Sequence, residues 1–306
     1  RNIAEFAMKR LLTGIVYILI LLGAFLLRRY VHLLFFDGLV LVFSLIGTYE
    51  MLRAFGERID RVQKAVVLFF SSGIIICYAA ADTVYRHLQE MRPATVNYSP
   101  LITFVVFMAG LALLFGLLVF RHEKTSLESL GCSLICYLYP SVFLLVLTGC
   151  NHMPDYSEIG ILFVFVICPF ADSLAYVFGR LFGRWLPKKL APTVSPNKTL
   201  IGGFGGLVGG ALGAVCIFFV YYGLLEPCDL NTEWLNLVFF IALGVLTAAF
   251  TEFGDLVESA VKRKLEIKDM GRLLPGHGGI LDRIDSTLYA GLIVCFVLTM
   301  RILAVG

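Results

Sequence analysis

The sequence predicts an all-α polytopic membrane protein of about nine transmembrane helices. Hydrophobic residues make up 59% of its 306 residues and charged residues only 15%, and its mean hydropathy of +0.87 excludes an ordinary soluble domain. Long apolar runs recur along the whole chain, with most of the Lys and Arg residues between alternate runs. The net charge of +3 is too small to suggest a nucleic-acid partner, so the expected surroundings are membrane lipid.

Apolar runs mark each predicted helix. A run is identified by the length and continuity of its apolar residues, because about 20 such residues in a helix cross the hydrocarbon core of a bilayer. We expect an outside loop over 82–100, which contains Pro93 and Pro100. The predicted spans lie at about 11–27, 33–52, 65–81, 101–120, 133–149, 159–179, 200–225, 234–251 and 286–305.

The distribution of Lys and Arg predicts how the helices are oriented. With the N-terminus in the cytoplasm, most of the 25 Lys and Arg residues fall in inside segments, as the positive-inside rule requires. The outside loops around 150–158 and 226–233 then contain carboxylates but no Lys or Arg. We therefore expect a cytoplasmic N-terminus. The compact length favours a bacterial inner membrane, with an organelle or endoplasmic-reticulum membrane as the alternative.

Two regions are expected along the chain. Residues 1–158 would form about five N-terminal transmembrane helices, and residues 159–306 would form a catalytic transmembrane region. This second region contains two cytoplasmic loops, at 180–199 and 252–285, which carry most of the side chains suited to chemistry.

Isolated polar residues of the N-terminal region leave several interpretations open. Asp37 lies inside an apolar run, where a carboxylate is a functional candidate, but it is near one end, where water can reach it. Glu50, at the cytoplasmic end of the same run, is expected to be solvated or paired with Arg53. Cys150 and Cys228 both fall in loops that we expect outside, so a disulfide between them is left open.

Asp172 lies well inside the sixth apolar run and is therefore a candidate site residue. Pro169 precedes it and is expected to open the helix at that point. A helix places four residues of this segment on one face, at i, i+4, i+7 and i+8, namely Asp172, Tyr176, Gly179 and Arg180. The alternative is that Asp172 interacts with Arg180 or with the backbone only to hold a kink.

The Ser195-Pro196 pair is a helix-start signal, with Ser195 as the N-cap and Pro196 at the first helical position. Lys198 and Thr199 then fall in the first turn, beside free N–H groups and the positive end of the helix dipole. This arrangement predicts an anion site. It is not a Walker loop, because Asn197 stands before the lysine. The alternative is a capped helix whose lysine extends to the lipid head groups.

The segment 252–285 combines carboxylates, cations and glycines next to the last apolar run. If the preceding helix continues into it, Asp255, Ser259 and Lys262 share one face. The loop that follows, at 276–279, is rich in glycines, which permit positive φ and close approach of the backbone to a ligand. The segment therefore suits a phosphorylated ligand.

Carboxylates of this segment predict a Mg²⁺–phosphate site. Asp282 and Asp285 lie at i, i+3, so one face of a helix presents both. Mg²⁺ usually takes one or two carboxylates together with phosphate oxygens, whereas the single His277 and the absence of cysteine from the segment argue against zinc. The alternative is a salt-bridged cytoplasmic loop bound to anionic head groups.

The same segment resembles the signature of the phosphatidate cytidylyltransferases, also called CDP-diacylglycerol synthases. Thirteen positions match it, namely Ser259, Lys262, Arg263, Lys268, Asp269, Gly271, Pro275, His277, Gly278, Gly279, Asp282, Arg283 and Asp285. Three upstream blocks are also similar to blocks of that family, at 254–256, 195–199 and 172–180.

This resemblance implies the reaction CTP + phosphatidate → CDP-diacylglycerol + pyrophosphate. It also implies dependence on Mg²⁺ and, usually, a homodimer. The metal would be bound by Asp255 and Asp282. Asp285 and Asp172 would lie beside them, and a second cation is left open.

The basic residues are assigned to the two substrates. We expect Ser195, Lys198 and Thr199 to hold the phosphates of CTP at the start of their helix. Lys262 and Arg263 would hold phosphatidate or the leaving pyrophosphate.

The glycine-flanked His277 is expected to donate to a phosphate, since phosphatidate is already largely ionised near neutral pH and needs no general base. Gly278 and Gly279 would let the backbone approach the nucleotide. Two other functions are weighed: a CTP-dependent lipid kinase of related fold, and an anion or lipid transporter without catalysis.

Overall fold

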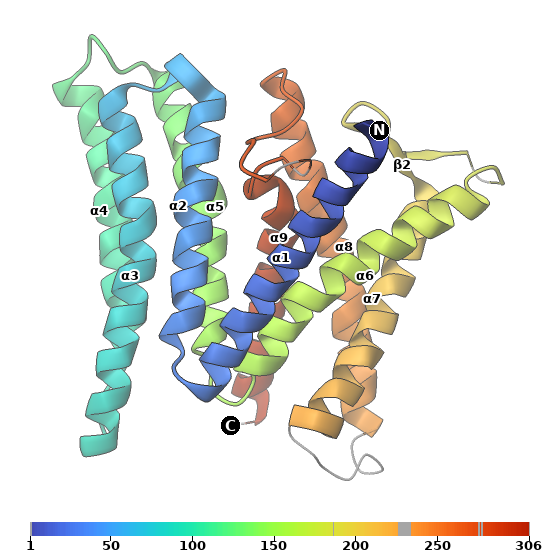
Figure 1. The fold of residues 1–306 in the computed structure, drawn as a ribbon. Helices are drawn as coiled ribbons and strands as arrows, with labels where there is room; N and C mark the ends of the chain where they lie inside the picture. The colour runs from blue at the N-terminus through green and yellow to red at the C-terminus, as the bar shows by residue number, and fades with distance from the viewer. Residues whose placement is uncertain (1, 186, 226–233, 275, 277, 306) are drawn as a thin grey trace. The chain divides into compact units, whose positions relative to one another are not determined.

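A computed structural model describes residues 2–185, 187–225, 234–274, 276 and 278–305. Within these residues nine helices are long and apolar enough to cross a membrane, which confirms the predicted all-α polytopic class (Figure 1). The long helices are α1 (Asn2–Tyr30), α2 (Leu34–Phe55), α3 (Arg61–Met91), α4 (Ser99–Phe120), α5 (Leu127–Asn151), α6 (Ser157–Phe182), α7 (Leu200–Val220), α8 (Trp234–Lys264) and α9 (Leu281–Val305). Shorter elements are η1 (Gly56–Arg58), β1 (Lys189–Ala191), β2 (Ser195–Thr199) and the π-helical turn η2 (Tyr221–Leu225).

The predicted loop over 82–100 is wrong in its first half. Helix α3 continues to Met91 and is 31 residues long. No glycine or proline occurs between Asp82 and Met91, so nothing in the local sequence ends the helix before Pro93. Asp82 is buried in this extension and pairs with Arg86 one turn later, with 2.7 Å between Oδ2 and Nε.

The chain divides into two compact units. Unit 1 contains Arg1–His152 and Asp269–Arg283, and unit 2 contains Met153–Lys268 and Ile284–Gly306. The first division lies close to the predicted boundary at residue 158. The sequence-based division did not anticipate that the segment 269–283 groups with the N-terminal helices.

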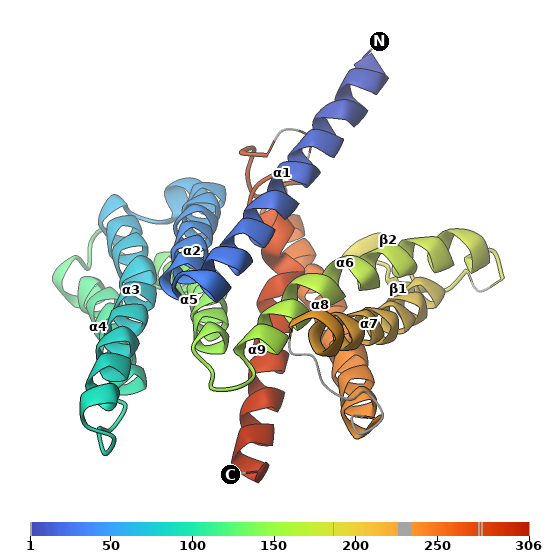
Figure 2. The ribbon, with the colours of Figure 1, turned by 60° about the horizontal axis from the view of Figure 1, so that its bottom comes forward.

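In unit 1, α3 packs against α2, α4 and α5, and α2 packs against α5. Both ribbon views show α2, α3, α4 and α5 side by side (Figure 1, Figure 2). Polar groups are buried where α2 begins and α5 ends. His152 lies between two carboxylates there, with Nε2 2.7 Å from Asp37 Oδ2 and Nδ1 2.6 Å from Asp82 Oδ2. Asp37, which sequence alone left open, is thus part of a buried ion-pair network.

The network favours the protonated form of His152. Burial lowers the pKa of His152, but hydrogen bonds and charges of Asp37 and Asp82 raise it by more, so the pKa lies above its ordinary value. His152 follows the last residue of α5 and lies outside the spans. Asn151 also bonds Asp37 Oδ1, at 2.8 Å, and accepts from Arg28 Nε at 2.8 Å. The disulfide left open for Cys150 cannot be described, because Cys228 lies outside the described residues.

In unit 2, α6, α7 and α8 pack together. Glycines in α7 bring the backbones close: a Cβ added at Gly209 would lie 2.5 Å from the Phe170 carbonyl oxygen, and one at Gly210 would lie 2.5 Å from Ala248 Cβ. Small residues are a common means of close packing between membrane helices. Between α6 and α7, β1 and β2 pair antiparallel, with Lys189 opposite Thr199 and Ala191 opposite Ser195.

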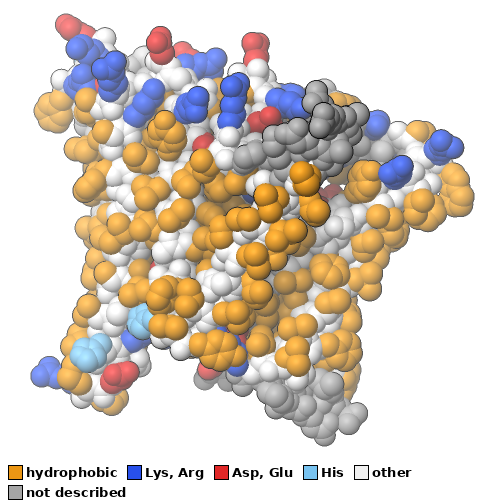
Figure 3. Space-filling model, in the orientation of Figure 1, with side chains coloured by type: hydrophobic (Ala, Val, Ile, Leu, Met, Phe, Trp, Pro, Cys, Tyr) orange, Lys and Arg blue, Asp and Glu red, His pale blue; other side chains and the backbone are white. Residues whose placement is uncertain are grey.

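The surface agrees with a membrane environment. Large hydrophobic side chains are exposed along the helices, as Figure 3 shows. In unit 1, Lys and Arg gather where α2 connects to α3 and α4 connects to α5, at the upper left of the view. Charged ends and apolar sides are the pattern expected of spanning helices. Which end faces the cytoplasm stays a prediction.

Candidate active site

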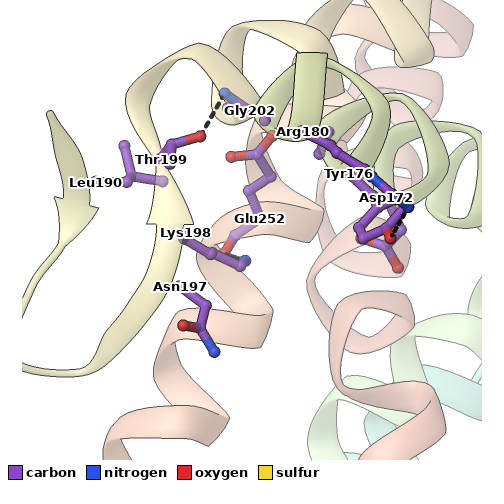
Figure 4. Close-up of a pocket in the computed structure, with 12 residues that line it drawn as sticks. Asp172, Tyr176, Arg180, Leu190, Asn197, Lys198, Thr199, Gly202 and Glu252 are labelled. Atoms are coloured by element: carbon purple, nitrogen blue, oxygen red, sulfur yellow. Dashed lines mark hydrogen bonds between the residues drawn. The ribbon is translucent and has the colours of Figure 1, made fainter. Parts of the chain in front are cut away.

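A cavity of about 490 Å³ opens in unit 2. Its wall comes from α6, the β1–β2 pair, α7 and α8, and Figure 4 shows polar side chains from α6, β2 and α8, whereas α7 contributes glycines. The lining residues are Asp172, Ala175, Tyr176, Gly179, Arg180, Leu190, Asn197, Lys198, Thr199, Gly202, Gly203 and Glu252. Several of the residues predicted from two separate segments of the sequence, 172–180 and 195–199, therefore meet at one place.

The predicted polar face of α6 is confirmed. All four of its residues, Asp172, Tyr176, Gly179 and Arg180, line the cavity. The expectation that Pro169 opens the helix is wrong, because α6 runs without a break from Ser157 to Phe182. Arg180 Nη1 donates to the Tyr176 hydroxyl at 3.1 Å, which directs the guanidinium along the cavity wall.

The predicted helix start at Ser195 is also wrong. Ser195–Thr199 forms strand β2, and the N-cap of α7 is Thr199, whose Oγ1 accepts from Gly202 N at 3.1 Å (Figure 4). Pairing with β1 satisfies the backbone of this segment and so competes with an earlier helix start. The helix N-terminus still faces the cavity, because Thr199, Gly202 and Gly203 line it.

Lys198 extends from β2 to α8. Its Nζ lies 2.6 Å from Asp255 Oδ2 and 3.4 Å from the Glu252 carbonyl oxygen. The other oxygen of Asp255 accepts from Ser259 Oγ at 3.3 Å. The residue predicted to bind phosphate and the residue predicted to bind metal are thus joined as an ion pair that is only part-buried and can exchange partners when a ligand enters.

Glu252 was not identified as a site residue from the sequence. Its carboxyl group lies against Gly203 and Gly206 of α7, and its Oε1 is buried without a hydrogen-bond partner among the described residues. Asp172, Lys198 and Asp255 are its charged neighbours. The available signal was its place at the end of an apolar run, three residues before Asp255, because carboxylates in such positions are rare and functional.

A second group of charges lies on the next turn of α8. Lys262 Nζ is 2.8 Å from Glu258 Oε2, and the Glu258 side chain is fully buried. Asp285 of α9 lies beside Glu258. Lys262 therefore neutralises buried carboxylates, while the exposed Arg263 contacts the Val194 carbonyl oxygen at 3.4 Å.

Asp282 belongs to unit 1, where its carboxylate binds backbone groups. Its Oδ2 accepts from Gly279 N at 2.8 Å and from Met270 N at 2.9 Å. Gly278 has a φ of +86°, as the loop prediction required. Asp255 belongs to unit 2, so the predicted pairing of Asp255 with Asp282 on one metal stays a prediction. His277 and Pro275 lie outside the described residues.

The donor set of the cavity fits Mg²⁺ in kind. Asp172 and Glu252 line the cavity and Asp255 pairs with Lys198 beside it, so all three can supply hard carboxylate oxygens. The unpartnered buried oxygen of Glu252 is the kind of group that a cation satisfies. Within the described chain, no three His, Cys, Asp or Glu side chains converge as a ready metal cage. Mg²⁺ does not require one, because it usually takes one or two carboxylates with substrate phosphate oxygens.

Comparison with curated proteins finds relatives that match less than half of the chain. A phosphatidate cytidylyltransferase of Staphylococcus haemolyticus is 45% identical over 129 residues, which are 42% of this chain and 45% of that protein. One of Haemophilus influenzae is 40% identical over 136 residues, 44% of each chain. One of Staphylococcus aureus is 41% identical over 129 residues, 42% of this chain and 45% of the relative. The matched region thus spans less than half of each relative.

The family comparison extends over nearly the whole chain. The sequence profile of the cytidylyltransferase family matches residues 8–301, which include every described residue of the cavity wall. The site geometry and the match concern the same residues, and the chain therefore belongs to the cytidylyltransferase family.

Proposed function

We propose that this protein transfers the cytidylyl group of CTP to phosphatidate, releasing pyrophosphate and forming CDP-diacylglycerol for phospholipid biosynthesis. The observation that carries the proposal is the cavity of unit 2, where Lys198 and Arg180 supply positive charge beside the carboxylates of Asp172 and Glu252, and where Lys198 also pairs with Asp255. The relatives of Staphylococcus haemolyticus and Haemophilus influenzae are named for the same activity.

The reaction needs positioning and charge neutralisation more than covalent chemistry. A phosphate oxygen of phosphatidate attacks the α-phosphorus of CTP, the bond from that phosphorus to the bridging oxygen breaks, and pyrophosphate leaves with the electron pair. Two phosphorylated groups must approach each other, so their negative charges must be offset. Lys198 and Arg180 would do this from opposite walls of the cavity.

Phosphate binding at the start of α7 would use the backbone. The first N–H groups of a helix have no intrahelical partner and attract anions. Thr199 caps one of them, that of Gly202. The remaining N–H groups and the glycine surface at Gly202 and Gly203 allow a phosphate of CTP to come close, with Lys198 leaving Asp255 to bind it and Ser195 at the far end of the same strand.

Mg²⁺ is part of the proposal. When bound, it would neutralise phosphate charge and orient the leaving group. Asp255 is the proposed ligand in unit 2, with Asp172 and Glu252 beside it, and Asp282 is the proposed ligand in unit 1. Lys262, Arg263 and Asp285 are proposed to shape the phosphatidate side, and a second cation is left open.

The setting of the enzyme is proposed from the sequence. The nine apolar helices among the described residues support an integral membrane enzyme. The compact length of the chain favours a bacterial inner membrane, and the distribution of Lys and Arg favours an active site that faces the cytoplasm. A homodimer is proposed on the family resemblance alone.

The test is a reaction with purified protein, CTP, phosphatidate and Mg²⁺, in which CDP-lipid and pyrophosphate are both measured. We expect equal amounts of the two products from the wild type. Asp255→Asn should lower the rate by about 10²–10³-fold, the usual cost of losing one electrostatic group from a transition state. Glu123→Gln, an exposed carboxylate of the α4–α5 connection, is the matched control.

Other outcomes would replace the proposal. Release of CDP with a newly phosphorylated lipid would identify a CTP-dependent lipid kinase. Folded protein that binds the substrates but forms neither product would favour a transporter. An Asp255→Asn variant as active as the control would remove Asp255 from the metal site.

A further inference from the structure

Glu50 of α2 contacts the segment 269–283, here called the signature loop, which lies more than 200 residues later in the chain. The expectation that it is solvated or paired with Arg53 is wrong, since Glu50 is only 5% exposed. Its Oε1 accepts from Ile280 N at 3.1 Å and its Oε2 accepts from Leu281 N at 2.9 Å. Both carboxylate oxygens thus bind backbone at the start of α9, where N–H groups lack intrahelical partners.

Two signature glycines lie against the same carboxyl group. A Cβ added at Gly279 would lie 2.5 Å from both Cδ and Oε1 of Glu50, and a Cβ added at Gly271 would overlap the same carboxyl. Gly271 and Gly279 are not among the described glycines with positive φ. Their lack of a side chain is therefore explained by the space that Glu50 occupies and not by their backbone conformation.

The loop is held by a second carboxylate from its own sequence. Asp282 accepts from Met270 N and Gly279 N, and the Gly271 N–H points to it at 3.4 Å. Glu50 and Asp282 together bind backbone at both ends of the segment 269–283. Charge-assisted bonds to backbone N–H groups are among the stronger hydrogen bonds, and the loss of one leaves a buried donor unpaired.

We propose that Glu50 is a positioning residue for the signature loop: it fixes the start of α9, and with it Asp282, without itself touching substrate. The anchoring role follows from contacts within unit 1. Its effect on catalysis rests on the proposed cytidylyltransferase function, because Asp282 is a proposed metal ligand.

A double-mutant cycle tests the proposal. Glu50→Ala, Gly279→Ala and the double variant are compared with wild type and with Glu57→Ala, an exposed carboxylate just after α2. We expect each single variant to lose at least about 10-fold in kcat with little change in KM, since misplaced groups slow chemistry more than binding. In the Glu50→Ala background, Gly279→Ala should cost nothing more, because the clash is gone. Neighbouring residues that share one interaction are non-additive.

Hydrogen exchange gives a readout that does not depend on activity. The amides of Ile280 and Leu281 should exchange at least 10-fold faster in Glu50→Ala than in Glu57→Ala. Where Glu50→Ala does not fold, Glu50→Gln replaces it, because the amide keeps the size but offers one acceptor instead of two. An intermediate exchange rate is then expected.

Two results would overturn the proposal: additive losses in the cycle, or unchanged exchange at Ile280 and Leu281. Failure of the proposed function looks different. In that case the wild type forms no CDP-lipid, whereas the exchange data, and the same cycle measured by the unfolding midpoint, still report whether Glu50 anchors the loop.

Discussion

Buried charges are satisfied in one region of this protein and left incomplete in another. In the unit 1 network, each oxygen of Asp37 and Asp82 has a partner: His152 and Asn151 for Asp37, and Arg86, Asn97 and His152 for Asp82. In unit 2, Glu252 keeps a buried oxygen with no partner in the described residues. A complete network stabilises a fold, whereas an incomplete one is available to a ligand.

The largest effect should come from breaking the complete network. His152→Ala leaves Asp37 and Asp82 as buried like charges, and removal of one partner from a buried pair costs about 3–5 kcal/mol. We expect a loss of this size in the free energy of unfolding, measured by denaturant titration in detergent. His87→Ala is the control, since that side chain is 72% exposed. Equal stability of both variants would contradict a stabilising role for the network.

A substitution in the incomplete network of unit 2 should lower the activity and leave the stability almost unchanged. Lys198→Met removes the cation from the cavity and should lower kcat/KM for CTP by about 10²–10³-fold. Its unfolding midpoint should stay near that of wild type, because the Lys198–Asp255 pair is part-exposed and such pairs stabilise little. Lys189→Met on the neighbouring strand is exposed and serves as control. A large fall in stability with normal activity would reverse the assignment of the two regions.

A smaller effect is expected from pH. The folded pKa of His152 is raised above the ordinary value of 6.5, so its charged pairs stabilise fully below about pH 6.5 and are lost as pH rises through the folded pKa. The wild type should therefore lose stability from pH 6 to pH 9. This loss should be smaller than the loss caused by the substitution His152→Ala, because neutral histidine keeps a hydrogen bond. The loss should be absent in His152→Gln. A wild type whose stability does not change over this range would exclude a charged His152.

Structural features that depend only on neighbours along the chain were predicted well. The nine spans found among the described residues follow from local hydropathy, and the polar face of α6 follows from helical spacing. The wrong predictions concern segments whose backbone is satisfied by other parts of the chain. Ser195 is a good N-cap by local rules, yet strand pairing with β1 places it outside the helix. Pro169 is accommodated within α6, because neighbouring groups in a packed membrane helix can make up for one lost hydrogen bond.

The sequence by itself determined the membrane class, the spans and the residue types of the site, because each depends on composition and on spacings shorter than a helix. Only the tertiary structure decided which carboxylates are satisfied. Glu50, Asp37 and Glu252 are all carboxylates near the ends of apolar runs, and nothing local distinguishes them. One binds the start of α9, one binds His152, and one keeps an open oxygen beside Lys198. Their partners come from other segments of the chain, so their roles depend on packing between segments that are distant in the sequence.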